Sequence, residues 1–177
     1  MQLPGNNSET KTLAMLGAFC LFLSSIEFMI PKPLPFFRIG IANLPIMLAL
    51  GIFPLRPLLL LAGIKVLGQA FITGALFSHI FLFSLAGAYA STLSMYLLRR
   101  ILGQKHLSYI GIGTTGAITS NIAQLALAQF FIFGSSARFI APPFLAAGII
   151  TGIALGIFCE LFVQNSKWYR SMAGKNT

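Results

Sequence analysis

The stretch IPKPLPFFRIGIANLP, residues 30–45, interrupts an apolar chain with four prolines, a lysine and an arginine. A proline cannot donate a backbone hydrogen bond and disfavours a helix at the residue before it, so the stretch predicts a break between two helices. Apolar runs on both sides predict membrane-spanning helices. We expect the stretch to lie at the outer surface, or to dip back from it as the wall or lid of a cavity that satisfies its backbone polar groups.

The composition of the whole chain is that of a membrane protein. Of its 177 residues, 56% are hydrophobic and 8% are charged, against about a quarter charged in soluble domains, and the mean hydropathy is +0.86. We predict one all-α domain, residues 1–177, with six transmembrane helices of roughly 20 residues each. The predicted spans are residues 12–30, 39–53, 57–76, 79–98, 111–134 and 141–163, of which the second is short for a full crossing.

The charge pattern predicts the orientation of the chain. Twelve Lys and Arg against three acidic residues give a net charge of +9, but no basic patch is interleaved with exposed aromatics, so we expect no nucleic-acid partner. With the N-terminus inside, eight cations fall in cytoplasmic loops: Lys11, Arg56, Arg99, Arg100, Lys105, Lys167, Arg170 and Lys175. Three fall in outer loops: Lys32, Arg38 and Arg138. This asymmetry follows the positive-inside rule and predicts that both termini are cytoplasmic.

Lys65 lies deep in the third predicted span, and an ionisable group in hydrocarbon costs several kcal/mol unless protein surrounds it. Gln69 follows four residues later, which predicts a polar stripe on one helical face. The stripe is a candidate ligand-binding surface. Alternatively, Lys65 pairs with Glu27 or with a backbone carbonyl and only fixes helix packing.

Three further polar residues lie in predicted spans. Glu27, near the outer end of the first, either orders nearby cations or accepts a hydrogen bond from a ligand. Asn121 and Gln124 lie on one helical arc of the fifth. Amides in a span either tie helices together or read a polar ligand, and both readings stay open for this pair.

Other motifs argue against nucleotide or metal binding. GIGTTG, residues 111–116, matches the spacing of a dinucleotide-binding loop, but no strand precedes it and no acid follows at the expected distance. Cys20 and Cys159 lie in apolar runs and His79 stands alone, so we expect neither a metal site nor a cofactor.

Small residues recur at intervals of four in two predicted spans, which lets helices approach closely. One such ridge is Gly148, Gly152 and Gly156, which packs either within the chain or against a partner. The other is Ala14 and Ala18, which lies in the first span.

The strings AMLGA, IEFMIPKPLPFFRIGIANLP and GAITSNIAQLALA together resemble a bacterial membrane family called the Gx transporter family, whose older label is heptaprenyl diphosphate synthase component I. The resemblance covers almost the whole chain, and its most specific part is Pro33, Pro35, Arg38, Gly40, Ala42 and Asn43. The chain departs from the pattern at Ser120, where the family often has a histidine. The resemblance implies a location in the bacterial cytoplasmic membrane.

The first half is also similar to the S components of energy-coupling factor vitamin transporters, which are six-helix proteins that bind a vitamin near the outer surface. This similarity implies a small-molecule substrate, contact with membrane lipid, and partnership with a membrane coupling subunit and ATPases. It further implies that Ala14 and Ala18 face the coupling subunit. Riboflavin-specific members have a similar first loop, so the implied ligands include flavin-like molecules.

We therefore predict a non-enzymatic substrate-binding component of a small-solute importer. The predicted polar lining of its cavity consists of Arg38, Asn43, Lys65, Gln69, Asn121 and Gln124, with Glu27 ordering the cations. The apolar string FLFSLAGAY, residues 81–89, is expected to supply an aromatic wall. The alternative is a non-catalytic accessory subunit for prenyl diphosphate or quinone-lipid synthesis. Catalysis by this chain alone is excluded because it has no aspartate to hold magnesium against a diphosphate.

Overall fold

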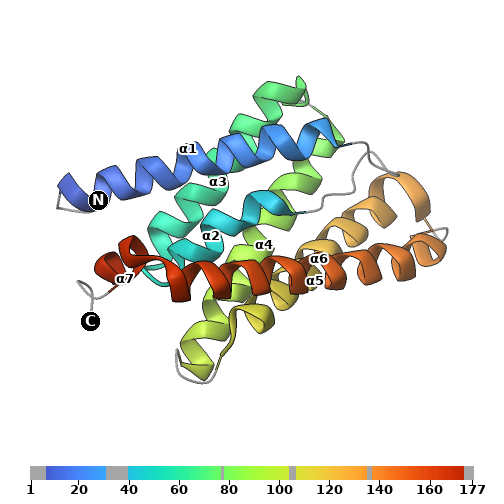
Figure 1. The fold of residues 1–177 in the computed structure, drawn as a ribbon. Helices are drawn as coiled ribbons and strands as arrows, with labels where there is room; N and C mark the ends of the chain where they lie inside the picture. The colour runs from blue at the N-terminus through green and yellow to red at the C-terminus, as the bar shows by residue number, and fades with distance from the viewer. Residues whose placement is uncertain (1–6, 31–39, 77, 104–106, 135–136, 174–177) are drawn as a thin grey trace.

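The computed structural model describes residues 7–30, 40–76, 78–103, 107–134 and 137–173, and within these ranges the chain forms helices and turns but no strand (Figure 1). The elements in order are α1 (Asn7–Met29), the 3₁₀ turn η1 (Ile41–Asn43), α2 (Leu44–Ala49), α3 (Leu55–Thr73), α4 (His79–Leu102), α5 (Tyr109–Ala128), the π turn η2 (Gln129–Phe133), α6 (Ala137–Asn165) and α7 (Lys167–Ala173).

Five helical segments of 19 to 29 residues are long and apolar enough to cross a membrane: Glu9–Met29, Leu55–Thr73, His79–Leu102, Tyr109–Phe133 and Ala137–Asn165. Their outward surfaces are apolar, with Phe71 73%, Phe130 82% and Phe139 85% exposed. An apolar surface of this extent would be covered by lipid, not water. The structure therefore supports a membrane protein built on five long helices.

The second predicted span, residues 39–53, is not confirmed as a spanning helix. Only η1 and the six-residue helix α2 form there, and six residues rise about 9 Å against a hydrocarbon core of about 30 Å. Pro45 is the second residue of α2, and Pro54 lies five residues beyond its end as the N-cap of α3, so prolines stand near both ends of this short run. All six residues of α2 are buried, because the helix contacts α1, α3, α5 and α6.

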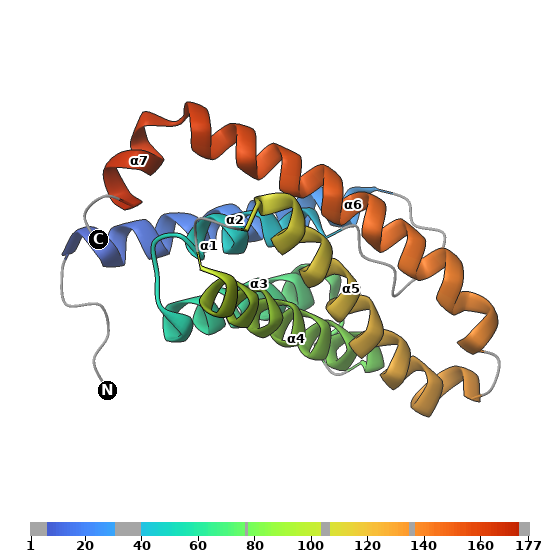
Figure 2. The ribbon, with the colours of Figure 1, turned by 90° about the horizontal axis from the view of Figure 1, so that it is seen from below.

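The order of the helices gives a second reason why α2 is central. In Figures 1 and 2, α1 begins at the end of the bundle where α7 lies, and α3 begins at that same end. The chain must therefore return between α1 and α3, and α2 runs along this return path. We call this end the basic end, because the described cations Lys11, Arg56, Arg99, Arg100 and Lys167 belong to the helix termini that meet there.

Glycines allow α5 and α6 to pack closely against each other. A Cβ added to Gly113 would lie 2.5 Å from the carbonyl oxygen of Gly152, and one added to Gly152 would lie 2.8 Å from that of Gly113. Gly156 likewise faces the backbone of Tyr109 and Ile110. The glycine ridge of α6 thus packs within the chain, which decides between the two alternatives above. Gly113, from the GIGTTG string, serves helix packing too.

The start of α6 differs from the prediction. The predicted span begins at residue 141, whereas the helix begins at Ala137 and runs through Pro142 and Pro143. The missing N–H groups of these prolines would have bonded to the carbonyls of Arg138 and Phe139, in the first turn. Because the prolines are the sixth and seventh residues of α6, these two carbonyls lack the N–H donor that the residue four positions later normally supplies.

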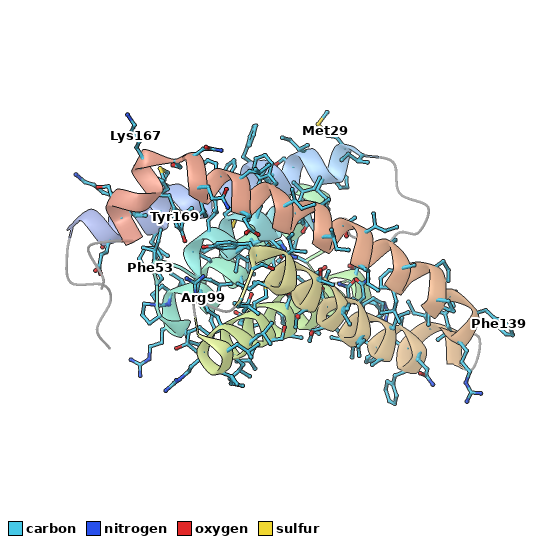
Figure 3. The ribbon with its side chains drawn as sticks, turned by 60° about the horizontal axis from the view of Figure 1, so that its bottom comes forward. Met29, Phe53, Arg99, Phe139, Lys167 and Tyr169 are labelled. Atoms are coloured by element: carbon cyan, nitrogen blue, oxygen red, sulfur yellow. The ribbon has the colours of Figure 1, made fainter. Side chains whose placement is uncertain are left out.

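Helix α7 is fastened to the basic end through Tyr169, which is 3% exposed (Figure 3). Its hydroxyl donates to the carbonyl of Leu48 in α2 at 3.1 Å and accepts from the Tyr109 hydroxyl at 2.9 Å. The Arg99 guanidinium lies 5.9 Å from the centre of the Tyr109 ring. These contacts tie α2, α5 and α7 together.

Alkaline pH should loosen this attachment. Burial, followed by the neighbouring Tyr109, raises the pKa of Tyr169 above its ordinary value of 10.0. Above pH 10 the unfolded chain releases this proton and the folded chain keeps it, so the free energy of unfolding falls as the pH rises. Between pH 10 and 11 the loss should be about 1 kcal/mol. Denaturant titrations should show this loss in the wild type and in Tyr109→Phe, but not in Tyr169→Phe; an equal loss in all three proteins would contradict the assignment.

Candidate functional site

A small polar cavity lies inside the bundle, where η1 and α2 meet α3, α4, α5 and α6. Its volume is about 30 Å³, enough for one or two water molecules. Its polar lining residues are Asn43, Lys65, Ser84, Ser91, Ser120, Asn121, Gln124 and Thr151. Lys65 is the charged residue among the described lining residues, and none of them is acidic. The cavity therefore presents a positive charge and several neutral hydrogen-bonding groups.

Lys65 is positioned by η1. It is 5% exposed near the middle of α3, and its ammonium group donates a short hydrogen bond to Oδ1 of Asn43. The amide oxygen thereby satisfies one of the three donors of the lysine. Asn43 is brought to this place by the turn that begins at Gly40, whose φ of 83° is left-handed and favours glycine.

Glu27 holds that turn in place. Its side chain, 2% exposed, accepts hydrogen bonds from the backbone N–H of Gly40 at 3.0 Å and of Ala42 at 3.3 Å, one on each carboxylate oxygen. Backbone N–H groups inside a membrane protein need such partners, because neither water nor lipid supplies them there. Glu27 is thus a positioning residue behind the cavity and not part of the described lining.

The two amides of α5 have different surroundings. Asn121 donates from Nδ2 to the carbonyl of Phe144 in α6 at 2.8 Å, so it ties these two helices together. Gln124 donates from Nε2 to Ser120 Oγ at 2.9 Å, and its Oε1 is buried with no hydrogen-bond partner among the described residues. On α4, the Oγ of Ser91 is also buried and has no hydrogen-bond partner among the described residues. Gln124 and Ser91 are 3% and 1% exposed, so bulk water does not satisfy them.

Glycines on neighbouring helices provide room for these polar side chains. A Cβ added to Gly87 of α4 would lie 2.6 Å from Nε2 of Gln124, and one added to Gly116 of α5 would lie 2.9 Å from Oγ of Ser91. A Cβ on Gly148 of α6 would overlap the side-chain amide of Asn121. The close approach of α4, α5 and α6 around the cavity depends on these three positions.

The structure brings together part of the predicted binding set. Asn43, Lys65, Asn121 and Gln124 line one cavity although they are up to 81 residues apart in the sequence. Gln69 is 4% exposed but is not among the described lining residues, because it lies one turn, about 6 Å, farther along α3.

Arg38 lies outside the described residues. Ala14 and Ala18 are exposed on α1, where they are accessible to a partner or to lipid.

The sequence analysis missed the contribution of α4. Ser84, Ala88, Ser91 and Met95 line the cavity at intervals of four, three and four residues, which is the spacing of one helical face. This stripe of small and polar residues could have been found in the sequence. The expected aromatic wall was wrong, since the described lining residues contain no aromatic side chain.

No group of three or more His, Cys, Asp or Glu side chains in the described part of the chain is placed to hold a metal ion. His79 begins α4 and packs against the ring of Phe131, with 6.0 Å between ring centres. The described lining residues can therefore offer a ligand hydrogen bonds and one positive charge, that of Lys65.

The sequence matches a known protein family. The family described as heptaprenyl diphosphate synthase component I matches residues 16–162. The chain belongs to this family. The match includes every described residue of the polar lining, from Asn43 to Thr151. Searches of curated proteins and of solved structures found no match, so the similarity to energy-coupling factor S components is not confirmed.

Proposed function

We propose that this family member is the solute-binding component of a membrane importer and that the central cavity is its binding site. The observation that carries the proposal is the pair of unpartnered buried acceptors, Gln124 Oε1 and Ser91 Oγ, in a cavity that Lys65 also lines. A buried polar atom without a partner costs about 1–3 kcal/mol. The cavity has room for one or two water molecules beside these residues, and a solute that donates the same hydrogen bonds would take their place.

The lining defines the kind of solute. Lys65 provides positive charge and Gln124 Oε1 accepts a hydrogen bond, while no described lining residue is acidic. A small solute that carries an acidic group together with a hydroxyl or amine would match both. Without an aromatic side chain for stacking, the described lining gives a flavin ring no special support.

Entry of such a solute requires movement, because about 30 Å³ holds only water. The mobile element in our proposal is η1 with the preceding Gly40, which closes one side of the cavity through Gly40 and Asn43. This element is attached to the long helix α1 through Glu27, whose carboxylate accepts hydrogen bonds from the N–H groups of Gly40 and Ala42. Outward displacement of η1 would open the cavity and separate Asn43 from Lys65.

Transport would need partners. The proposal assigns ATP hydrolysis to separate subunits and solute binding, without catalysis, to this chain. Exposed Ala14 and Ala18 on α1 offer a close-packing face for a membrane coupling subunit. The excess of cations at the basic end supports a cytoplasmic position of that end in a bacterial inner membrane.

The second candidate function follows from the family's description. An accessory subunit of a prenyl diphosphate synthase would fit the name, with catalysis in a partner protein. A long apolar chain would need an extended lateral groove, whereas the central cavity is small and polar. For this reason we favour the importer component.

Thermal-shift measurements can separate the two functions. Purified protein would be screened against water-soluble vitamins, flavins and short prenyl diphosphates. Our proposal expects stabilisation by a small polar acid, in proportion to RT ln(1 + [L]/Kd). Stabilisation by prenyl diphosphates alone would favour the accessory subunit and overturn the importer.

Gln124→Met offers a sharper test. It removes the unpartnered Oε1 together with the hydrogen bond from Nε2 to Ser120 Oγ, so the free energy of unfolding of the empty protein should change by no more than about 1 kcal/mol, while the affinity for the solute found in the screen should fall about tenfold. Lys65 is a less suitable target, since it also binds Asn43. Isothermal titration would measure the affinity, with Thr119→Val as the control; the Thr119 hydroxyl bonds only to its own helix, at Thr115 O. Equal affinity of Gln124→Met and the wild type would exclude the cavity as the site.

A further inference from the structure

A second hollow lies on the surface of the basic end, between α1 and α7. It has a volume of about 420 Å³ and is lined by Lys11, Thr12 and Met15 of α1 and by Trp168 and Met172 of α7. It shares no lining residue with the central cavity. We call it the α1–α7 groove.

The attachment of α7 creates this groove. Tyr169 points into the protein and binds Leu48 O, which leaves the adjacent face of α7 turned toward α1. Trp168 and Met172, four residues apart, lie on that face. The Thr12 hydroxyl lies 3.9 Å from the sulfur of Met172 and closes the floor between the two helices. The groove is therefore formed by the packing of α7 beside α1.

The groove changes from cationic to apolar along its length. Lys11 is exposed near the start of α1, and Met15, 49% exposed, lies one turn deeper in the span. None of the five described lining residues is acidic. Exposed Arg56, Arg100 and Lys167 add positive charge at the same end of the bundle, where Figure 3 shows Lys167 and Tyr169. An occupant that matches this surface has a negative head and an apolar body.

We propose that the α1–α7 groove binds one anionic phospholipid. The phosphate lies against the Lys11 ammonium, and the glycerol and upper acyl carbons lie along Met15 and Met172. Trp168 takes the position between polar and apolar surroundings that tryptophan favours at membrane interfaces. A cation near an anionic membrane surface contributes about 1 kcal/mol, which is roughly a fivefold preference for an anionic over a zwitterionic lipid.

Trp168 makes this proposal directly measurable, because it is the single tryptophan of the 177-residue chain. Its fluorescence in the full-length protein would be recorded in mixed micelles that contain brominated phosphatidylglycerol or brominated phosphatidylcholine, whose bromines quench on contact. We expect half-quenching at about a fivefold lower mole fraction of phosphatidylglycerol. Lys11→Gln should make the two curves coincide, and Lys11→Arg should keep them apart.

Arg56→Gln is the matched control, since it removes one exposed cation at the same end but outside the groove, and it should preserve the preference. Thermal melting curves would establish that each variant is folded. Equal quenching by both lipids in the wild type, or an unchanged preference in Lys11→Gln, would overturn the proposal. Quenching by neither lipid would also overturn it and would indicate that a second copy or another protein covers the groove.

Discussion

Replacing Glu27 with alanine should lower the free energy of unfolding by about 2–5 kcal/mol, because two backbone N–H groups of the η1 turn would lose their acceptor. The N–H of Ala42 is fully buried and that of Gly40 is partly buried, so bulk water would replace the carboxylate only in part. The turn should then detach, and Asn43 should leave Lys65. Stability would be measured by denaturant titration in micelles, and release of the turn by faster hydrogen exchange at Gly40 and Ala42.

Glu9→Ala provides the control for charge. Glu9 lies in the first turn of α1, only partly buried, so its replacement should cost less than about 1 kcal/mol through the helix dipole. Similar small losses in both variants would show that Glu27 does not hold the turn. Unchanged exchange at Gly40 and Ala42 in Glu27→Ala would lead to the same conclusion.

Gly113→Ala should destabilise the protein by about 1–3 kcal/mol, since the added methyl group would meet the backbone of α6 at Gly152. Backbone atoms cannot rotate away as a side chain can, so α5 and α6 must separate. The separation should also disturb the hydrogen bond from Asn121 to Phe144. Thermal melting of the purified protein would measure the loss.

Gly111→Ala, two residues away on the same helix, is a matched control with the opposite expected sign. A methyl group there would find its nearest neighbour at 3.6 Å, an ordinary contact with Leu107. Alanine favours a helix over glycine by up to about 1 kcal/mol, so this variant should melt at the wild-type temperature or above it. If both variants lost stability equally, the α5–α6 contact at Gly113 would not be the cause of the loss.

These variants locate the two kinds of contact on which the cavity depends. The long helices α3, α4, α5 and α6 form a frame in which glycines permit close approach. The short element of η1 and α2 is held in this frame by one carboxylate at Glu27 and by the hydroxyl of Tyr169 at its other end. In the proposed importer component, the long helices and the buried α2 would form the rigid frame, and η1 would be the part that moves.

The five long helices could be predicted from sequence because each carries its own signal. A run of about 20 apolar residues must satisfy its backbone within itself when it lies in lipid, so composition alone selects a helix. The run at residues 39–53 carried the same apolar signal but became α2, since its prolines and its contacts with four helices permit a short buried helix. Hydropathy cannot distinguish burial in lipid from burial in protein.

The residues predicted to bind the ligand show the same limit of prediction from sequence. Lys65, Asn121 and Gln124 could be selected because a polar group in an apolar span requires a partner. Their neighbour Gln69 satisfied the same criterion and is not among the described lining residues, whereas Ser84 and Ser91 carried a weaker signal and do line the cavity. Glu27 was predicted to order nearby cations or to accept a hydrogen bond from a ligand, whereas its hydrogen bonds from the backbone of Gly40 and Ala42 were not foreseen.

By itself, the sequence determined that this protein lies in a membrane, that its polar residues are concentrated in a few spans, and to which family it is similar. Only the tertiary structure decided that α2 is the buried centre of the bundle, which polar side chains share a cavity, and which glycines pack helices together. The physical reason is that apolar runs and helical periodicity are local properties of a chain. A cavity, by contrast, is the space left among side chains from distant segments, and its shape depends on how closely the helices approach one another.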